Sequence, residues 1–281
     1  TPLYSSAASD VYKRQRQPKN DSSVLVDSET QPMVSREASP SVSLEEFMFQ
    51  LPSDKKRIIE DVIGIFETGK RGGDYSTTVY LADGAGITYG KHQAIDKSGS
   101  LDAIVKRYIK LGSRGAGKLK PYLEMLEANG TVGFDPMNLP DNIKELMRIL
   151  NAAGDDLIMQ QAQDEVFDEW YWEPMAIQCR EMQLTLPLSW LVVYDSSIHS
   201  GPKGISYIRK MFTEMPPSGG GDEKLWVKAY IKARRNWLAT HKKTILHATV
   251  YRMDSILQLI EEDNWELTIP FTLFRPRVTL S

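Results

Sequence analysis

The chain has 281 residues, of which 41% are hydrophobic and 25% charged, and its 34 Lys and Arg against 37 Asp and Glu give a formal net charge of −3. This composition predicts one or two ordinary globular domains. The acidic balance argues against a protein that coats duplex DNA, which usually carries a basic excess, so we expect no nucleic-acid partner. Apolar runs fall far short of the roughly 18 residues needed to span a bilayer, so we expect no membrane partner. The single cysteine, Cys179, excludes an internal disulfide, and we expect it to be a small core residue.

Residues 1–43 differ from the rest of the chain in being rich in Ser, Pro, Gln and Asn, with no helical or strand period. Such a stretch buries too little apolar surface to offset the entropy lost on ordering, so we expect a disordered tail or linker ahead of a folded domain over 44–281. It contains no apolar core of a secretory signal peptide. Residues 5–15 resemble a translated sequencing adaptor, so the natural N-terminus is expected to be missing.

The first predicted element is an amphipathic helix followed by a β-hairpin. We expect Ser53 to cap this helix and Gly69 to end it, with Glu67 in its last turn. Residues 75–89 are enriched in β-branched and aromatic side chains, and Asp83-Gly84 is a turn signal. This pattern predicts a short β-hairpin or small sheet.

Helical periodicity returns after the hairpin and persists nearly to the C-terminus. Further helices are predicted over residues 101–111, 143–152, 156–179, 186–199, 205–212, 223–240 and 244–262. The expected fold class is therefore mainly α with a small β element, arranged as two lobes with a substrate cleft between them.

One motif points to a function that we reject. Residues 112–118 carry the glycines and the lysine of a phosphate-binding loop, but Leu119 stands where a Ser or Thr should hold magnesium, and a helix precedes the motif instead of a strand. We predict a mobile loop between helices. The histidines show no pair at i, i+4 spacing on one helix, so we expect no metal and no cofactor.

Glu67 and Asp83 form the most informative pair. Glu67 lies beside Phe66 near the negative end of a helix, and both surroundings disfavour a charged carboxylate, which suits a general acid. Asp83 opens a glycine-rich polar turn, where backbone groups and water keep a carboxylate ionised. Two carboxyl groups in opposed environments suit glycoside hydrolysis. The alternative for Glu67 is a solvated carboxylate at a helix end, and the alternative for Asp83 is an ordinary turn residue.

The order helix, Glu and β-hairpin resembles the lysozyme superfamily, and Asp83-Gly84-x-Gly86-x-Thr88-x-Gly90 is similar to the catalytic aspartate segment of glycoside hydrolase family 46, the chitosanases. Further stretches resemble that family in the same order along the chain, over about residues 54–270. They are residues 161–169, residues 193–201, Arg234-Arg235, Arg252-Met253-Asp254 and residues 263–267.

The resemblance implies a role for each matched residue. Glu67 corresponds to the general acid, Asp83 to the base that activates water, and Thr88 to the residue that positions this water. Asp195 corresponds to a buried acid in an ionic relay. Arg252 is expected to link Asp195 to Glu67. Arg235 is expected to be a second partner of Asp195, with Arg234 as the alternative for that position. Family members invert anomeric configuration.

Substrate contacts are predicted near the expected cleft. Lys91 and His92 near the expected cleft depart from the acidic lining that suits polycationic chitosan, and they leave open an anionic glycan, peptidoglycan. The candidate sugar contacts are Tyr75, Tyr89, His92, Asp164 and Asp168. For the aromatic members the alternative is core packing, and for the acidic members it is a solvated helix face.

Three functions therefore remain: an inverting endo-chitosanase, a muramidase of the same fold, and a glycan-binding domain that has lost catalysis. The presence of Glu67, Asp83 and Thr88 argues against the third. By the family resemblance we expect a secreted or cell-envelope monomer whose partner is a polysaccharide.

Overall fold

The computed structural model describes residues 49–281 except residues 70, 81–83 and 276, and the side chains of residues 202 and 203. The predicted tail over 1–43 and the predicted base Asp83 therefore lie outside the described residues.

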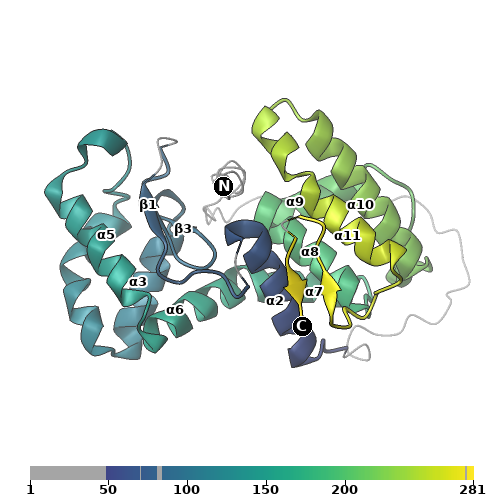
Figure 1. Ribbon diagram of the computed structural model, residues 1–281, viewed down its shortest axis with the longest axis horizontal. Coiled ribbons are helices and arrows are strands. Elements are labelled where there is room, and N and C mark those ends of the chain that lie inside the picture. The colour runs from purple at the N-terminus through teal and green to yellow at the C-terminus, as the bar shows by residue number, and fades with distance from the viewer. Residues whose placement is uncertain (1–48, 70, 81–83, 276) are drawn as a thin grey trace, which may run out of the picture.

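The first lobe combines a small sheet with short helices (Figure 1). Strands β1 and β3 flank β2, and both pairings are antiparallel, with Val79 opposite Thr88 and Thr88 opposite Ile95. The predicted hairpin is thus confirmed, and a third strand is added to it. The elements of this lobe are β1 (Thr78–Tyr80), β2 (Ile87–Tyr89), β3 (Ala94–Ile95), α3 (Ser100–Leu111), α4 (Leu123–Glu127) and α5 (Asp141–Ala153).

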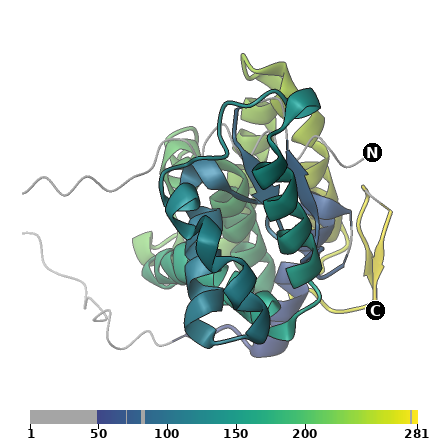
Figure 2. The same ribbon diagram turned by 90° about the vertical axis from the view of Figure 1, so that its left-hand side faces the viewer.

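The second lobe is a helical bundle, and α6 (Leu157–Phe167) runs towards it from the first lobe (Figure 1). Figure 2 shows the hairpin of β4 and β5 on one edge of the molecule, separate from the three-stranded sheet. The elements of the second lobe are α2 (Ser53–Thr68), α7 (Glu173–Glu181), α8 (Pro187–Ser200), α9 (Pro202–Arg209), α10 (Glu223–Thr240), α11 (Tyr251–Glu261), β4 (Phe271–Thr272) and β5 (Thr279–Leu280).

Helix α8 is the centre of the second lobe, because every one of its residues is buried. It is apolar on nearly all sides, which is typical of a helix enclosed by others, and it packs against α2, α7, α9 and α10. Asp195 lies near the middle of this helix and is therefore carried into the core.

Helix α2 ends where the sequence predicts but begins differently. Gly69 adopts a left-handed conformation with φ 76°, and its N–H donates to the Ile65 carbonyl at 2.9 Å. A residue with a side chain is strained at this φ, so glycine suits this end of the helix. The predicted cap at Ser53 is wrong: Ser53 is the first helical residue, and Pro52 precedes it without a side-chain capping bond.

Two predicted helices are interrupted. The helix expected over 156–179 is divided into α6 and α7 by a π-helical turn, Asp168–Trp172. Pro174 follows in the first turn of α7, where a missing N–H is tolerated, whereas within a continuous helix it would remove a hydrogen bond. The helix expected over 244–262 is a 3₁₀ helix, Thr244–Thr249, followed by α11.

The prediction of a mobile glycine-rich loop over residues 112–118 is also wrong. It forms a 3₁₀ helix, Arg114–Lys118, and the Ser113 hydroxyl donates to the Asp156 carboxylate at 2.5 Å. The expectation that Cys179 is a buried core residue is confirmed. Within the described part of the chain, no helix has the length and apolarity required for crossing a membrane.

Candidate active site

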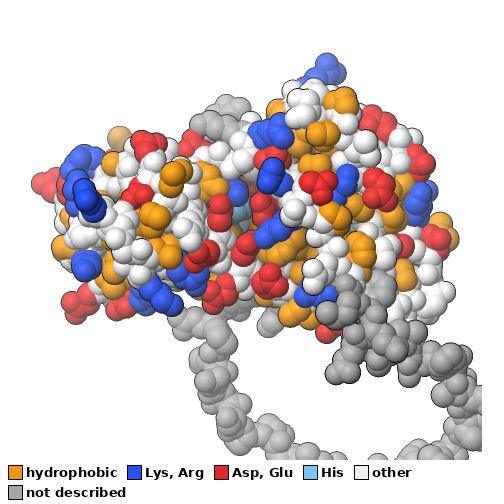
Figure 3. Space-filling model, turned by 90° about the horizontal axis from the view of Figure 1, so that it is seen from below, with side chains coloured by type: hydrophobic (Ala, Val, Ile, Leu, Met, Phe, Trp, Pro, Cys, Tyr) orange, Lys and Arg blue, Asp and Glu red, His pale blue; other side chains and the backbone are white. Residues whose placement is uncertain are grey.

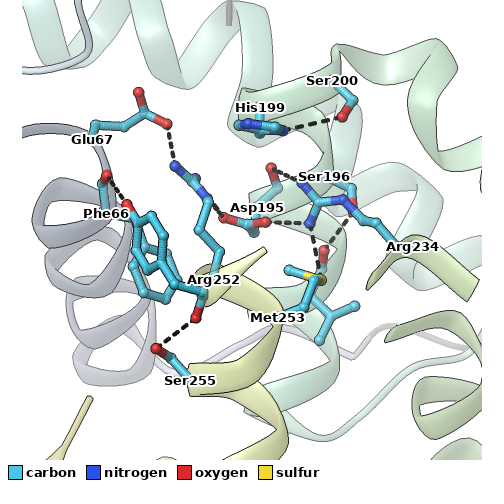
Figure 4. Close-up of polar contacts among 12 residues, drawn as sticks. Phe66, Glu67, Asp195, Ser196, His199, Ser200, Arg234, Arg252, Met253 and Ser255 are labelled. Atoms are coloured by element: carbon cyan, nitrogen blue, oxygen red, sulfur yellow. Dashed lines mark hydrogen bonds and ion pairs between the residues drawn. The ribbon is translucent and has the colours of Figure 1, made fainter. Parts of the chain in front are cut away.

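Glu67 occupies the last turn of α2 and is almost fully buried, with 3% of its surface exposed. Its Oε1 accepts a hydrogen bond from Arg252 Nη1 at 2.8 Å (Figure 4). The other oxygen, Oε2, has no hydrogen-bond partner among the described residues. Arg252 therefore fixes the Glu67 carboxyl through one of its two oxygens.

Asp195 connects Glu67 to the core of the second lobe through Arg252. The Arg252 guanidinium donates to Asp195 Oδ1 from Nε at 2.8 Å and from Nη2 at 2.5 Å, while its Nη1 reaches Glu67. A planar guanidinium has donors on two edges and can bridge two carboxylates in this way. The predicted contact of Arg252 with both Asp195 and Glu67 is therefore present.

Arg234 completes the arrangement on the far side of Asp195. Its Nη1 donates to Asp195 Oδ2 and lies near the sulfur of Met253 (Figure 4). His199, one helical turn after Asp195 on α8, is also buried, and its Nδ1 lies 3.4 Å from the Ser200 hydroxyl. Asp195 thus faces two guanidinium groups, one of which also binds Glu67.

The electrostatics of Asp195 follow from this pairing. Burial raises the pKa of Asp195, but the charges of Arg252 and Arg234 outweigh it and hold the pKa well below the usual aspartate range. Burial likewise lowers the pKa of Arg252, but Asp195 and Glu67 outweigh it and raise this pKa. The Asp195 contribution to stability is therefore present above about pH 4, the ordinary aspartate value, and is lost as pH falls through the lowered pKa.

Arg235 is not the second relay partner that the sequence analysis expected. It is exposed, and its Nε donates to Asp254 at 2.6 Å on the surface. Arg234 makes the buried contact with Asp195 instead, because it shares a buried face of α10 with Tyr230 and Leu238, at i−4 and i+4. This helical spacing is present in the sequence and distinguishes Arg234 from Arg235.

The two neighbouring arginines should respond differently to truncation. We expect Arg234→Ala to lower the free energy of unfolding by about 3–5 kcal/mol, because it leaves part of the buried Asp195 charge uncompensated. Arg235→Ala, at the surface, should change it by no more than about 0.5 kcal/mol. Urea denaturation of both variants checks this, and equal effects would contradict the assignment.

Thr88 lies on β2, in the first lobe, and is almost fully buried. Its hydroxyl has no hydrogen-bond partner among the described residues. In the sequence Thr88 follows Asp83, the expected base, by five residues, and Asp83 itself lies outside the described residues. The hydroxyl is thus a buried polar group without a described partner.

Two of the predicted sugar contacts are core residues instead. Tyr89 is fully buried in the hydrophobic core, because it faces inward from β2. His92 is buried too, and its ring lies against Phe167 with a centroid separation of 4.4 Å. Neither side chain presents the exposed face that stacking on a sugar requires.

The other predicted contacts take part in polar pairs between segments. Asp164 on α6 accepts from the Tyr75 hydroxyl at 2.8 Å and pairs with Lys91 Nζ at 3.0 Å. Asp168 pairs with Lys56 Nζ at 2.8 Å. Lys56 lies in the first turn of α2 and Glu67 in the last, about 16 Å further along the helix at 1.5 Å per residue.

These pairs belong to the region where the lobes meet. Figure 3 views the molecule from below and shows acidic and basic side chains interspersed there. Lys91, which the sequence analysis treated as a cation near the cleft, is buried against Asp164. Its charge is therefore compensated within the protein.

A metal centre has no support in the described residues, among which no group of three or more His, Cys, Asp or Glu is placed to bind an ion. Tyr251, which sequence reasoning missed, also reaches α2, because its hydroxyl donates to the Phe66 carbonyl at 2.8 Å.

Residues 61–271 match the family described as Glycosyl hydrolase family 46. A chitosanase of Bacillus subtilis (strain 168) is 27% identical over 235 residues, which cover 80% of this chain and 83% of that protein. A chitosanase of Streptomyces sp. (strain N174) is 27% identical over 167 residues, 57% of each chain.

Solved structures show the same fold. The native chitosanase from Bacillus subtilis MY002 superposes with a TM-score of 0.72 at 23% identity, covering 83% of this chain and 100% of that one. A Gynuella sunshinyii chitosanase in complex with chitotetraose gives a TM-score of 0.71 at 24% identity, covering 83% and 99%. The mainly α fold with small antiparallel sheets predicted from the sequence is thereby confirmed.

Proposed function

The chain belongs to glycosyl hydrolase family 46. On that premise we propose that this glycoside hydrolase cleaves internal linkages of chitosan, a polymer of β-1,4-linked glucosamine. The relatives with the most extensive matches described above are chitosanases, and one of the similar structures holds chitotetraose. Chitosan is too large to enter a cell, so we place the reaction outside the cell or in its envelope. We also propose that the enzyme is a monomer.

The observation that carries the proposal is the environment of Glu67. A guanidinium holds one oxygen of this buried carboxyl, and the other oxygen has no hydrogen-bond partner among the described residues. A carboxyl fixed in this way supports the delivery of a proton from a defined position. We assign to Glu67 the role of general acid, which protonates the leaving glycosidic oxygen. The relay of Asp195, Arg252 and Arg234 holds this carboxyl in position.

The second half of the reaction is assigned to the β-hairpin. Asp83 acts as a general base on a water molecule, which attacks the anomeric carbon from the face opposite to the leaving group, and the Thr88 hydroxyl helps to hold that water. The bond to the leaving oxygen breaks as the new bond to water forms, so configuration is inverted. An inverting pair of carboxyls is separated by about 6.5–9.5 Å to leave room for the water.

Replacing Asp83 with asparagine should abolish turnover, and the wild-type enzyme should release the α-anomer first. An amide cannot accept the proton from the attacking water, and inversion of a β-linkage gives the α-product. NMR of the first-formed anomer and initial rates of the variant check both statements. Release of the β-anomer first would exclude the general-base role of Asp83.

Peptidoglycan as an alternative substrate loses its supporting observation, because Lys91 and His92 are buried in the protein and do not form a cationic lining. The experiment is a comparison of reducing ends released from chitosan with solubilisation of purified peptidoglycan at equal enzyme concentration. We expect the first activity to dominate. Clearing of peptidoglycan without hydrolysis of chitosan would replace our proposal with the muramidase, and activity on neither would favour a glycan-binding domain.

A further inference from the structure

Tyr251 and Arg252 are adjacent residues in the first turn of α11, and both contact the last turn of α2. The Tyr251 hydroxyl donates to the main-chain carbonyl of Phe66 at 2.8 Å, and Arg252 Nη1 donates to the carboxylate of Glu67 at 2.8 Å. One turn of α11 therefore binds the backbone before Glu67 and the side chain of Glu67 itself.

The backbone contact meets a requirement of the helix end. The last carbonyl groups of an α-helix have no partner within the helix and need other donors when they are buried. In α2 the Ile65 carbonyl accepts from Gly69 N–H, and the Phe66 carbonyl accepts from Tyr251. The hydroxyl thus fixes the peptide group that leads directly into Glu67.

Ring contacts reinforce this attachment. The Phe66 and Tyr251 rings meet edge to face, with centroids 5.9 Å apart at an angle of 80°. The Arg252 guanidinium lies over the Phe66 ring, 5.0 Å from its centroid. Figure 4 shows Phe66, Glu67 and Arg252 gathered at the end of α2. Burial raises the pKa of Tyr251, so its hydroxyl keeps the proton that it donates.

We propose that Tyr251 is a positioning residue for the reaction, holding the last turn of α2 so that the Glu67 carboxyl points at the leaving oxygen. This inference rests on the proposed role of Glu67 as the general acid. A general acid must lie within hydrogen-bond reach of the oxygen that it protonates, and small displacements of such a group lower the rate strongly.

Tyr251→Phe tests this proposal, because the variant keeps the ring contact with Phe66 and removes only the hydroxyl. We expect kcat on chitosan to fall about tenfold, with KM changed by less than about twofold, because proton delivery is a transition-state interaction. The second substrate is a chitosan oligosaccharide that carries a dinitrophenyl leaving group. Dinitrophenolate departs without being protonated, so on this substrate the variant should retain wild-type kcat. A residue with a purely structural role would not separate the two substrates.

Tyr108→Phe is the matched control. Tyr108 is a buried tyrosine of the first lobe whose hydroxyl donates to Asp156 at 2.6 Å, and no hydrogen bond among the described residues joins it to Glu67. This variant should lose thermal stability and keep kcat on chitosan. All rates are measured at a temperature at which circular dichroism shows each variant folded.

Unchanged kcat of Tyr251→Phe on chitosan, or an equal loss on both substrates, would overturn the role of Tyr251. Glu67→Gln, measured on the same two substrates, separates this failure from that of the proposed function. If Glu67→Gln spares the activated substrate while Tyr251→Phe does not, only the Tyr251 role fails. If Glu67→Gln loses both substrates equally, the general-acid assignment itself is wrong.

Discussion

Glu67→Gln is expected to lower turnover of chitosan by on the order of 10²–10⁴-fold, the usual contribution of a general acid. The amide has the size of the carboxyl, and its carbonyl oxygen can still accept the hydrogen bond from Arg252, but it has no acidic proton to deliver. The fold should persist, because Glu67 has one described polar partner and its Oε2 is unpartnered among the described residues. Initial rates of reducing-end release and the thermal midpoint are the two measurements.

The same substitution earlier in the helix provides the control for Glu67→Gln. Glu60 is a half-buried glutamate of α2 that lies 3.6 Å from Lys56 Nζ, away from the relay. Glu60→Gln should keep wild-type turnover. If Glu67→Gln retained more than a tenth of the activity, the assignment of the acid would be wrong.

Arg252→Ala should reduce both stability and activity. Removing this guanidinium leaves the buried carboxylates of Asp195 and Glu67 without a shared cation, and breaking a buried pair in this way costs about 3–5 kcal/mol. Turnover should fall as well, since the Glu67 carboxyl loses its described hydrogen-bond donor. Urea denaturation gives the first effect, and rates measured far below the unfolding midpoint give the second.

Arg252→Lys refines this test. A lysine retains the charge but lacks the planar fork that reaches Asp195 and Glu67 together, so we expect a loss of stability between those of the wild type and the alanine variant. A change of less than about 0.5 kcal/mol in Arg252→Ala would correspond to a solvated surface arginine and would contradict the bridging role.

The sequence predicts the elements of this fold well where local patterns decide them. Gly69 ends α2 because a left-handed residue is required there, and α10 has the bounds that its apolar period predicts. The division between α6 and α7 was missed, because the apolar period continues through the π-helical turn and only Pro174 hints at a break. The prediction that Ser53 caps α2 was wrong, because Pro52 occupies the N-cap position and Ser53 is already helical.

The site was predictable to the extent that the family resemblance identifies residues. Glu67, Asp195 and Arg252 come together as that resemblance implies. The choice between Arg234 and Arg235 depends on which face of α10 is buried, and the apolar spacing could have decided it. The burial of Tyr89 and His92 depends on tertiary contacts that no local pattern encodes, because β2 packs against α3 and α5 and the His92 ring lies against Phe167 of α6.

The ion pair between Glu67 and Arg252 joins residues 185 positions apart in the chain. A contact of such long sequence range stabilises the chain only after the entropy of closing the long loop has been overcome, so we expect it to form late in folding. The two halves of the relay therefore meet only when α11 docks against α2 and α8. During refolding, hydrolytic activity would return with this last docking step, later than the helical signal that local segments produce on their own.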